Sequence, residues 1–328
     1  MNVNRRGEFE LIDSLLAPLA RGAAGALGLA DDAAVLQALD GTEIVATTDA
    51  LVAGVHFNLD DPPDLVGQKL LRVSLSDLAS MGAEPDVYLL TIALPPDCDD
   101  SWLESFASGL AIDQKEFNVR LVGGDTVSTS GPLMLSVTAL GRVPIGQALL
   151  RSGAHEEDEI WVSGSIGDSA LGLLAIQSAL VSGKGREERW LKERYLLPRP
   201  RTSLGLALRG LASSCIDISD GLIADLNHVC RVSGLSASVE VERIPISDPA
   251  RAVLADNPDL IQSILGGGDD YELLFTASPR VHEAVEQASH LCGYCVTRIG
   301  KMSAGSGVEV VDGNNEQIDI SKMGYTHF

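Results

Sequence analysis

Apolar runs with the period of a strand alternate along this chain with runs that have the period of a helix. Helical spacing is found from Glu8 to Leu19, from Pro63 to Met81 and from Ser101 to Phe117. The segments "DVYLLTIALP", "VRLVGGDTV" and "LMLSVTALGRV" have the composition of buried strands, and "AAVLQAL" and "TEIVATT" predict a strand pair joined by a hairpin turn at Asp40-Gly41. Aromatic residues make up only 4% of the chain and glycines number 33, so the core must be aliphatic and the turns tight. We therefore expect a globular α/β or α+β protein.

The second half repeats the order of strand, glycine turn and helix. A length of 328 residues favours two domains. The sequence becomes polar and rich in turns around residues 142–158, which predicts domains at 1–150 and 151–328. "EIWVSGSIG" then predicts a strand that leads into a helix, and "GGGDDYELLF" predicts a glycine turn that enters a strand. The charged segment "KGREERWLKERYLL" predicts a solvated helix and linker.

The charge balance limits the partners of this protein. Lys and Arg total 24 against 46 Asp and Glu, a formal net charge of -22, which repels nucleic acid and anionic membranes. No segment approaches the roughly 20 apolar residues of a membrane span. The five scattered cysteines predict no disulfide framework and fit a cytoplasmic location; the single pair Cys292 and Cys295 supports a zinc site only weakly, and buried thiols are the favoured interpretation. A phosphate-bearing substrate would be repelled too, unless metal ions reverse the local charge.

Acidic residues recur at predicted strand ends and glycine turns, where backbone can approach a ligand. They are Asp31, Asp32, Asp49, Asp125, Asp217, Asp220, Asp269 and Asp270. Asp77 differs, because its apolar neighbours predict a position near the buried side of a helix or at its end. Each has an ordinary structural explanation: Ser219 or Asp220 is a good N-cap for the helix that follows, and Asp125 could stabilise a turn. Their number favours a common site, because residues at the strand ends of one domain tend to converge on one edge.

Converging carboxylates need a cation or protons, since two unit charges 4 Å apart repel by about 4 kcal/mol at an effective dielectric near 20. Hard oxygen ligands select Mg²⁺ or Ca²⁺, and a site shared with phosphate oxygens favours Mg²⁺. No segment completes a GxxxxGK[ST] loop or a GxGxxG turn. A kinase built on this chain would therefore hold phosphates through metals and glycine-turn amides.

Ten motifs, taken in order, resemble the thiamine-monophosphate kinase family of the aminoimidazole-ribonucleotide-synthetase-like superfamily. They are "GLADDAAVL", "TTDALVAGVHF", "SLSDLASMGAEP", "LVGGDTV", "LLRSGA", "SGSIGDSALGL", "YLLPRPR", "IDISDGLIADLNH", "GGGDDYELLF" and "GYTHF". The resemblance spans the chain from about Gly7 to Phe328. It implies a two-domain α/β (α+β) protein and a homodimer whose N-terminal sheets form a barrel across both copies. The C-terminal α/β domain is then expected to complete the active-site cleft.

The resemblance also implies an activity: ATP- and Mg²⁺-dependent in-line transfer of a phosphoryl group to thiamine monophosphate, with several Mg²⁺ ions, no phospho-enzyme and no catalytic side chain. The implied magnesium ligands are Asp32, Thr47, Thr48, Asp49, Asp77, Asp125, Asp217 and Asp220. The implied ATP contacts are Gly124, Asp125, Arg151 and Ser219, and the implied substrate contacts are His56, Asp269 and Tyr325.

Three of these assignments have local alternatives. His56, judged alone, is an ordinary core or turn histidine, and Tyr325 could serve only in packing. Asp269 stands where the family has Glu, which moves the carboxylate by one methylene and leaves the substrate contact open. Two rival functions remain. One is another ATP-using synthetase of the same superfamily, which the motifs "TTDALVAGVHF" and "GYTHF" disfavour. The other is a non-catalytic regulator that binds Mg-nucleotide or thiamine, which the full acidic set disfavours.

Overall fold

A computed structural model of the chain describes residues 6–29, 33–178, 180, 185–314, 316–318, 320 and 324–325. The chain forms two compact units. Unit 1 comprises Met1–Leu78 and Glu84–Gly146, and unit 2 comprises Ala79–Ala83 and Gln147–Phe328. The units thus divide between Gly146 and Gln147, and a five-residue segment at the end of a unit 1 helix clusters with unit 2. Each unit has its own sheet.

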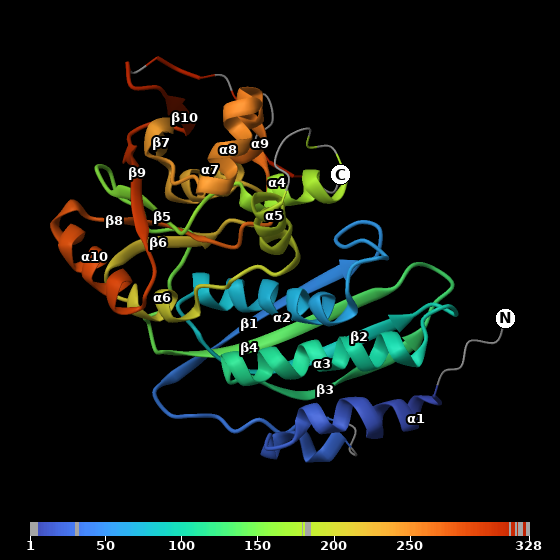
Figure 1. Ribbon diagram of the computed structural model, residues 1–328. Coiled ribbons are helices and arrows are strands. Elements are labelled where there is room, and N and C mark those ends of the chain that lie inside the picture. The colour runs from blue at the N-terminus through green and yellow to red at the C-terminus, as the bar shows by residue number, and fades with distance from the viewer. Residues whose placement is uncertain are drawn as a thin grey trace. The chain divides into compact units, whose positions relative to one another are not determined.

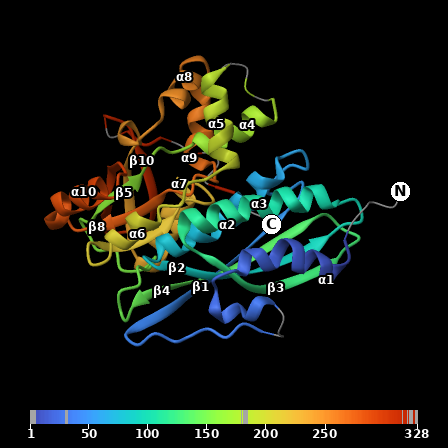
Figure 2. The ribbon, with the colours of Figure 1, turned by 60° about the horizontal axis from the view of Figure 1, so that its bottom comes forward.

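Unit 1 is a four-stranded sheet in the order β1-β4-β2-β3, with helices on both faces. Its strands are β1 (Thr42–Val52), β2 (Glu84–Leu94), β3 (Arg120–Ser128) and β4 (Met134–Pro144). Its long helices are α2 (Pro63–Ser80) and α3 (Asp100–Phe117), which lie on the same face of the sheet in Figures 1 and 2. The N-terminal segment consists of α1 (Glu8–Leu11), a π-helical turn (Ile12–Leu16) and two 3₁₀ turns (Ala17–Ala20 and Ala24–Leu29).

Local sequence explains most of these elements. The α3 helix starts at Asp99, whose side chain accepts a hydrogen bond from the Trp102 amide, and it stops at Asn118 in the left-handed conformation. Strand β4 alternates buried and half-buried residues along its whole length, as expected for a strand with one face against a core. The N-terminal segment packs Ala20 and Ala26 against Val122 on the opposite face of the sheet from α2.

The sequence prediction was wrong at one place in unit 1. Ala33–Leu39 is not a strand, and β1 pairs with β4 instead of forming a hairpin around Gly41. Val35 is 67% exposed, so this apolar run is not buried in a sheet. The remaining strands and helices of this half were predicted close to their observed bounds, although the first predicted helix is broken into short turns.

Unit 2 is a six-stranded mixed sheet in the order β10-β7-β9-β5-β8-β6. Its strands are β5 (Glu159–Ser163), β6 (Ala212–Asp217), β7 (Ser236–Glu240), β8 (Leu273–Ala277), β9 (Val296–Ser303) and β10 (Gly307–Val311). Its α-helices are α4 (Asp168–Ile176), α5 (Arg186–Leu196), α6 (Thr202–Ala207), α7 (Leu222–Ser233), α8 (Asp248–Asp256), α9 (Ile261–Gly266) and α10 (His282–Leu291), with single 3₁₀ turns at Val241–Arg243, Pro258–Leu260 and Pro279–Val281. Among the described residues of the whole chain, no helix is long and apolar enough to cross a membrane.

Side chains alternate across this sheet into two separate cores. Ile216 and Ile218 enter one core together with residues of α7 and α9, whereas Cys215 enters the other with Trp161 and Phe275. The two-residue period of a strand therefore separates neighbours in the stretch "CIDIS" onto opposite faces. This confirms the predicted common face for Ile216 and Ile218, and it places Asp217 at the end of β6, next to the loop that enters α7.

The charged segment before β6 was predicted to be a solvated helix and linker. That prediction is correct for the helix α5 and for exposed residues such as Arg186 and Glu193, but it is wrong for Arg194. Arg194 and Arg201 are buried and donate hydrogen bonds to the carboxylate of Glu272, which is fully buried on the segment that leads into β8. The hydroxyl of Ser163 donates to the same carboxylate at 2.5 Å. Two guanidinium groups and a hydroxyl thus compensate one buried charge, as a buried carboxylate requires.

Candidate functional site

Two carboxylates and a threonine of unit 1 meet between strand β1 and helix α2. Thr47 and Asp49 have the same parity on β1, so both point toward the face that α2 covers. The Thr47 hydroxyl donates a hydrogen bond to the carboxylate of Asp77 on α2, and the Ser74 hydroxyl donates to Asp49 at 2.7 Å. Three of the predicted magnesium ligands are therefore brought together.

The electrostatics of this group suit a cation. Burial, and secondly repulsion by Asp77, raise the pKa of Asp49 to about 6, although the hydrogen bond from Ser74 works in the opposite direction. A positive ion beside the two carboxylates would stabilise their charged forms and so offset both the burial and the repulsion. The donors are carboxylate and hydroxyl oxygens, which Mg²⁺ prefers over softer ligands. The residues present thus fit a magnesium ion.

Sequence inspection missed Ser74, which is fully buried and holds one oxygen of Asp49. Its position three residues before Asp77 is the signal that could have revealed it, because residues three apart lie on one face of a helix. Its hydroxyl orients the Asp49 carboxylate and supports its charged form.

Two other predicted ligands of unit 1 lie apart from this group. Thr48 has the opposite parity on β1, and its hydroxyl contacts the Val137 carbonyl at 3.2 Å and the Thr138 hydroxyl at 3.1 Å. Asp125 lies on β3, at the other edge of the sheet, and pairs with Thr91. The row that contains Asp49 crosses β4 and β2 before it reaches Gly124, so three strand spacings, about 14 Å, separate the two edges. Within one chain, Asp49 and Asp125 are too far apart to share an ion.

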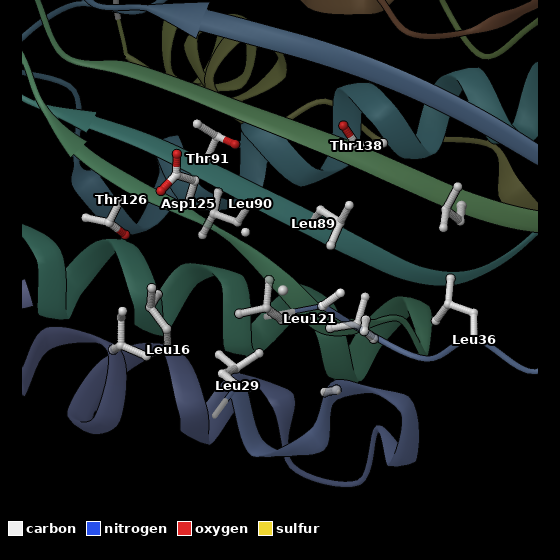
Figure 3. A pocket seen from close by; sticks show the side chains of 18 residues that line it. Leu16, Leu29, Leu36, Leu89, Leu90, Thr91, Leu121, Asp125, Thr126 and Thr138 are labelled. Atoms are coloured by element: carbon white, nitrogen blue, oxygen red, sulfur yellow. The ribbon is translucent and has the colours of Figure 1, made fainter. Parts of the chain in front are cut away.

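Gly124 and Asp125 line a pocket of about 640 Å³ between the sheet and the N-terminal segment. Figure 3 shows the Asp125 and Thr91 side chains next to each other above a group of leucines that includes Leu16 and Leu29. A Cβ at Gly124 would collide with the Leu90 carbonyl, so only glycine fits there. The pocket has mainly apolar walls with an acidic group at one end, and its volume lies in the range of roughly 300–1,000 Å³ that is usual for small-molecule sites.

His56 follows β1 and is half-buried. Its Nδ1 accepts a hydrogen bond from the Val52 amide at 3.0 Å, which leaves Nε2 as the protonated nitrogen of the neutral ring. The ring therefore stabilises the turn after β1. Asp32, a further predicted magnesium ligand, lies outside the described residues.

In unit 2, the predicted residues from three distant motifs converge on one loop. Asp217 ends β6 and is 2% exposed, and Ser219 and Asp220 follow it. The Ser219 carbonyl accepts from the Asp269 amide at 2.8 Å, and the Asp220 carbonyl accepts from the Tyr325 amide at 3.0 Å. Two predicted substrate contacts thus lie beside a predicted ATP contact and a predicted metal ligand.

The prediction that Ser219 or Asp220 caps α7 was wrong. The N-cap is Gly221, which has φ 135° and provides no side chain for a capping hydrogen bond. Instead, one oxygen of Asp225 in the first turn of α7 accepts from the amides of Ser219, Asp220 and Gly221, each at 3.1 Å. Burial raises the pKa of Asp225 to about 7, whereas these amides lower it.

The loop that carries Asp269 has an unusual backbone. Asp269 has φ 68° and Tyr271 has φ 51°, both in the left-handed region that non-glycine residues rarely occupy. Between them, the fully buried carboxylate of Asp270 accepts from the Gly167 amide at 2.7 Å. The Tyr271 hydroxyl donates to Asp269 at 3.2 Å. Anchoring of Asp270 thus fixes the direction in which Asp269 projects.

Arg151 is exposed in the segment before β5. It belongs to the same electrostatic environment as Asp220, because both act on the pKa of His228: burial lowers that pKa first, Arg231 and Arg151 lower it further, and Asp220 raises it. A predicted phosphate-binding guanidinium and a predicted metal ligand therefore lie near one imidazole. Tyr325 is 44% exposed, so its ring is accessible for stacking.

The chain matches known families along most of its length. Residues 30–143 match the family model "AIR synthase related protein, N-terminal domain", and residues 155–313 match "AIR synthase related protein, C-terminal domain". A thiamine-monophosphate kinase of Caulobacter vibrioides is 43% identical over 323 residues, which cover 98% of this chain and 90% of the relative.

Two solved structures are similar over nearly the whole chain. The crystal structure of a thiamine-monophosphate kinase from Stenotrophomonas maltophilia has a TM-score of 0.85 and 40% identity, and it covers 95% of this chain and 98% of its own. A structure described as "AaThiL complexed with AMPPCP and TMP" has a TM-score of 0.78 and 30% identity, and it covers 98% of this chain and 97% of its own. The predicted two-domain fold and the resemblance found in the motifs are confirmed.

Proposed function

The chain belongs to the thiamine-monophosphate kinase family, and we propose that it transfers the γ-phosphoryl group of ATP to the phosphate of thiamine monophosphate. The observation that carries this proposal is the 43% identity to a kinase of that name over 98% of the chain. In the reaction, an oxygen of the acceptor phosphate forms a bond to the γ-phosphorus, and the bond between that phosphorus and the β,γ-bridging oxygen breaks. The products are thiamine diphosphate and ADP.

The acceptor explains why the chain needs no catalytic base. A phosphate monoester is largely ionised at neutral pH, so its oxygen is already a nucleophile. The remaining difficulty is repulsion between two polyanions on a protein with a net charge of -22. Catalysis therefore depends on positioning and charge compensation, as in other phosphoryl transfers.

We propose that Thr47, Asp49 and Asp77 of unit 1 and Asp217 and Asp220 of unit 2 hold Mg²⁺ ions for this reaction, with Asp32, Thr48 and Asp125 as further ligands by motif position. When bound, the ions neutralise charge on the phosphate oxygens of both substrates. Ser74 keeps one oxygen of Asp49 in place, and Thr47 does the same for Asp77. Arg151 offers a planar set of donors to a phosphate.

We assign the nucleotide and the acceptor to different parts of the site. The apolar pocket beside Gly124 and Asp125 suits the base of ATP. By motif position, Ser219 of unit 2 is a further contact to the nucleotide. Asp269 and Tyr325, whose amides donate to the loop that carries Ser219, suit the amine and the ring of thiamine, and His56 contacts the same substrate by motif position. Asp269 in place of the family Glu retains the charge on a shorter arm.

We further propose a homodimer in which the edge strands β1 and β3 of two copies pair and close the two sheets into a barrel. The support is that Asp49 and Asp125 lie on opposite edges of the sheet of one chain. Pairing of β1 with the β3 strand of a second copy would bring the backbones of these two residues close together, while the strand register directs their side chains to opposite faces of the sheet. We place the enzyme in the cytoplasm, where the five free cysteines stay reduced.

The function is tested by incubation of the purified protein with ATP, Mg²⁺ and thiamine monophosphate, followed by chromatography of thiamine diphosphate and ADP. Both products are expected in equal amounts. Formation of ADP with another acceptor only, or no turnover of a folded and Mg²⁺-loaded protein, would refute the proposal.

The shared site is tested by subunit mixing. Asp49→Ala and Asp125→Ala proteins are each expected to be inactive, but after unfolding and refolding together half of the dimers are mixed, and each contains one site with both aspartates. The mixture should recover about one quarter of the wild-type rate. If a mixture shown to contain mixed dimers recovers no activity, both aspartates belong to the site of one chain.

A further inference from the structure

The carboxylate of Asp225 sits at the centre of the loop that joins β6 to α7. One of its oxygens accepts from the amides of three consecutive residues, Ser219, Asp220 and Gly221, each at 3.1 Å. Its side chain is 2% exposed, so water does not compete for these bonds. The carboxylate therefore fixes the backbone of the entire loop.

The position of Asp225 in the helix explains the geometry. It is the fourth residue of α7, and its own amide makes the ordinary helical bond to the Gly221 carbonyl at 3.0 Å. Gly221 has φ 135°, which turns the chain so that successive amides face inward. Such a concave row of amides attracts an anion. Here the anion is a side chain of the protein, so the loop is organised before any ligand binds.

The same loop uses its carbonyls to hold the other side of the site. The Ser219 carbonyl accepts from the amide of Asp269, and the Asp220 carbonyl accepts from the amide of Tyr325. Asp225 consequently connects, through one peptide segment, the residues proposed for ATP and magnesium with the two residues proposed for thiamine. A shift of this segment would displace both sets together.

We propose that Asp225 is a positioning residue for phosphoryl transfer: it touches neither substrate, but it fixes Ser219 and Asp220 toward the nucleotide and, through their carbonyls, Asp269 and Tyr325 toward the acceptor. This role rests on the function proposed above. Loss of the carboxylate charge weakens three charge-assisted hydrogen bonds at once. Groups that orient ligands from behind commonly change affinity or activity by about 10–100-fold when they are replaced.

The test compares Asp225→Asn with Asp158→Asn. Asp158 is a matched control, because it is also buried in unit 2 and accepts from a backbone amide (His155) and a hydroxyl (Ser213), but it does not touch the loop. Hydrogen exchange of the ligand-free protein reports the three amides directly. Affinity for a nonhydrolysable ATP analogue with Mg²⁺, measured by calorimetry, and the KM values for ATP and thiamine monophosphate report the two sides of the site.

In Asp225→Asn, we expect the amides of residues 219–221 to exchange at least ten times faster than in the wild type. We also expect analogue binding to weaken by about 10-fold or more and both KM values to rise. Asp158→Asn should leave all of these quantities within about two-fold of the wild type. Asp225→Glu, which keeps the charge and moves it by one methylene, should show the same pattern. Unchanged exchange at residues 219–221, or equal losses in the Asp225 and Asp158 variants, overturns the proposal. Because exchange is measured without substrates, it tests Asp225 even if the wild-type protein has no kinase activity.

Discussion

Asp77→Asn is predicted to stabilise the Mg²⁺-free protein while it removes activity. Asp77 repels the half-buried carboxylate of Asp49, and this repulsion is the second cause, after burial, of the rise in the pKa of Asp49 from 3.8 to about 6. Asparagine has nearly the same shape, and its carbonyl oxygen can still accept the hydrogen bond from the Thr47 hydroxyl. The substitution therefore removes charge without removing the contact.

The magnitude follows from the pKa. A rise from 3.8 to about 6 corresponds to about 3 kcal/mol between the two protonation states of Asp49. Burial is the larger cause, so the share of Asp77 is less than half, about 1 kcal/mol. For a unit of this size, that gain raises Tm by about 2–4 °C.

The sign of the pH dependence is fixed by linkage. A carboxyl group whose pKa is higher in the folded state than in the unfolded state destabilises the fold when it is ionised, so stability falls as pH rises from 3.8 to about 6. Asp77→Asn reduces that fall. The variant and the wild type should therefore differ little in Tm near pH 4 and should differ fully above pH 6.

The assay is thermal unfolding in EDTA between pH 4 and 8, with Asp125→Asn as control. Asp125 is exposed on the other edge of the sheet, so its substitution is expected to lower activity without raising Tm. Added Mg²⁺ should raise the Tm of the wild type more than that of Asp77→Asn, because the variant has lost a ligand. A Tm for Asp77→Asn equal to or below the wild-type value at pH 7.5 in EDTA would refute the repulsion argument.

Three further predictions test the remaining parts of the site and its support. Asp49→Ala and Asp217→Ala should each abolish turnover with an unchanged circular dichroism spectrum, and near-normal activity of either at saturating Mg²⁺ would remove that residue from the ligand set. Ser74→Ala removes the hydrogen bond to the Asp49 carboxylate, and a hydrogen bond to a charged group contributes about 1.5–3 kcal/mol. The Mg²⁺ concentration that gives half the maximal rate should therefore rise by about 10-fold. Ser76→Ala, at another fully buried serine of α2, serves as control. Arg201→Met should lower the stability of unit 2 to urea by about 3–5 kcal/mol, because Glu272 would lose its bidentate partner, and an unchanged urea midpoint would contradict this.

Local patterns predicted the elements of the fold far better than their pairing. Helix α3 and strands β2, β3 and β4 were predicted within a few residues of their observed bounds, because each has one apolar face that must be buried. Asp40-Gly41 has the composition of a hairpin turn, yet β1 pairs with β4, about one hundred residues away in register at Thr42 and Pro144. The choice between a local and a distant partner depends on the burial of whole faces, which the turn sequence does not contain.

The same limit explains which site residues the sequence could bring together. Asp49 and Asp77 converge because a strand and the following helix pack directly, so their meeting was predictable from local order. The separation of Asp125 depends on the strand order β1-β4-β2-β3, which places the third strand in sequence at the far edge. Spacing along the chain does not encode that order, and a common ligand set inferred from motifs therefore says nothing about whether its members belong to one chain or to two.

In the loop after β6, Asp225 supplies the carboxylate that holds the backbone, rather than Ser219 or Asp220. The sequence around Ser219 and Asp220 has the composition of a helix cap, but neither side chain caps α7. Instead, the carboxylate of Asp225 inside the helix accepts from the amides of residues 219–221, which precede the helix. A side chain used as a cap is directed at its own backbone and is lost to ligands. Since Asp225 accepts the amides, the backbone of the loop is held without using the side chains of Ser219 and Asp220. An acceptor supplied from within the helix is thus what allows this stretch to combine a fixed loop before α7 with residues proposed for ATP and magnesium.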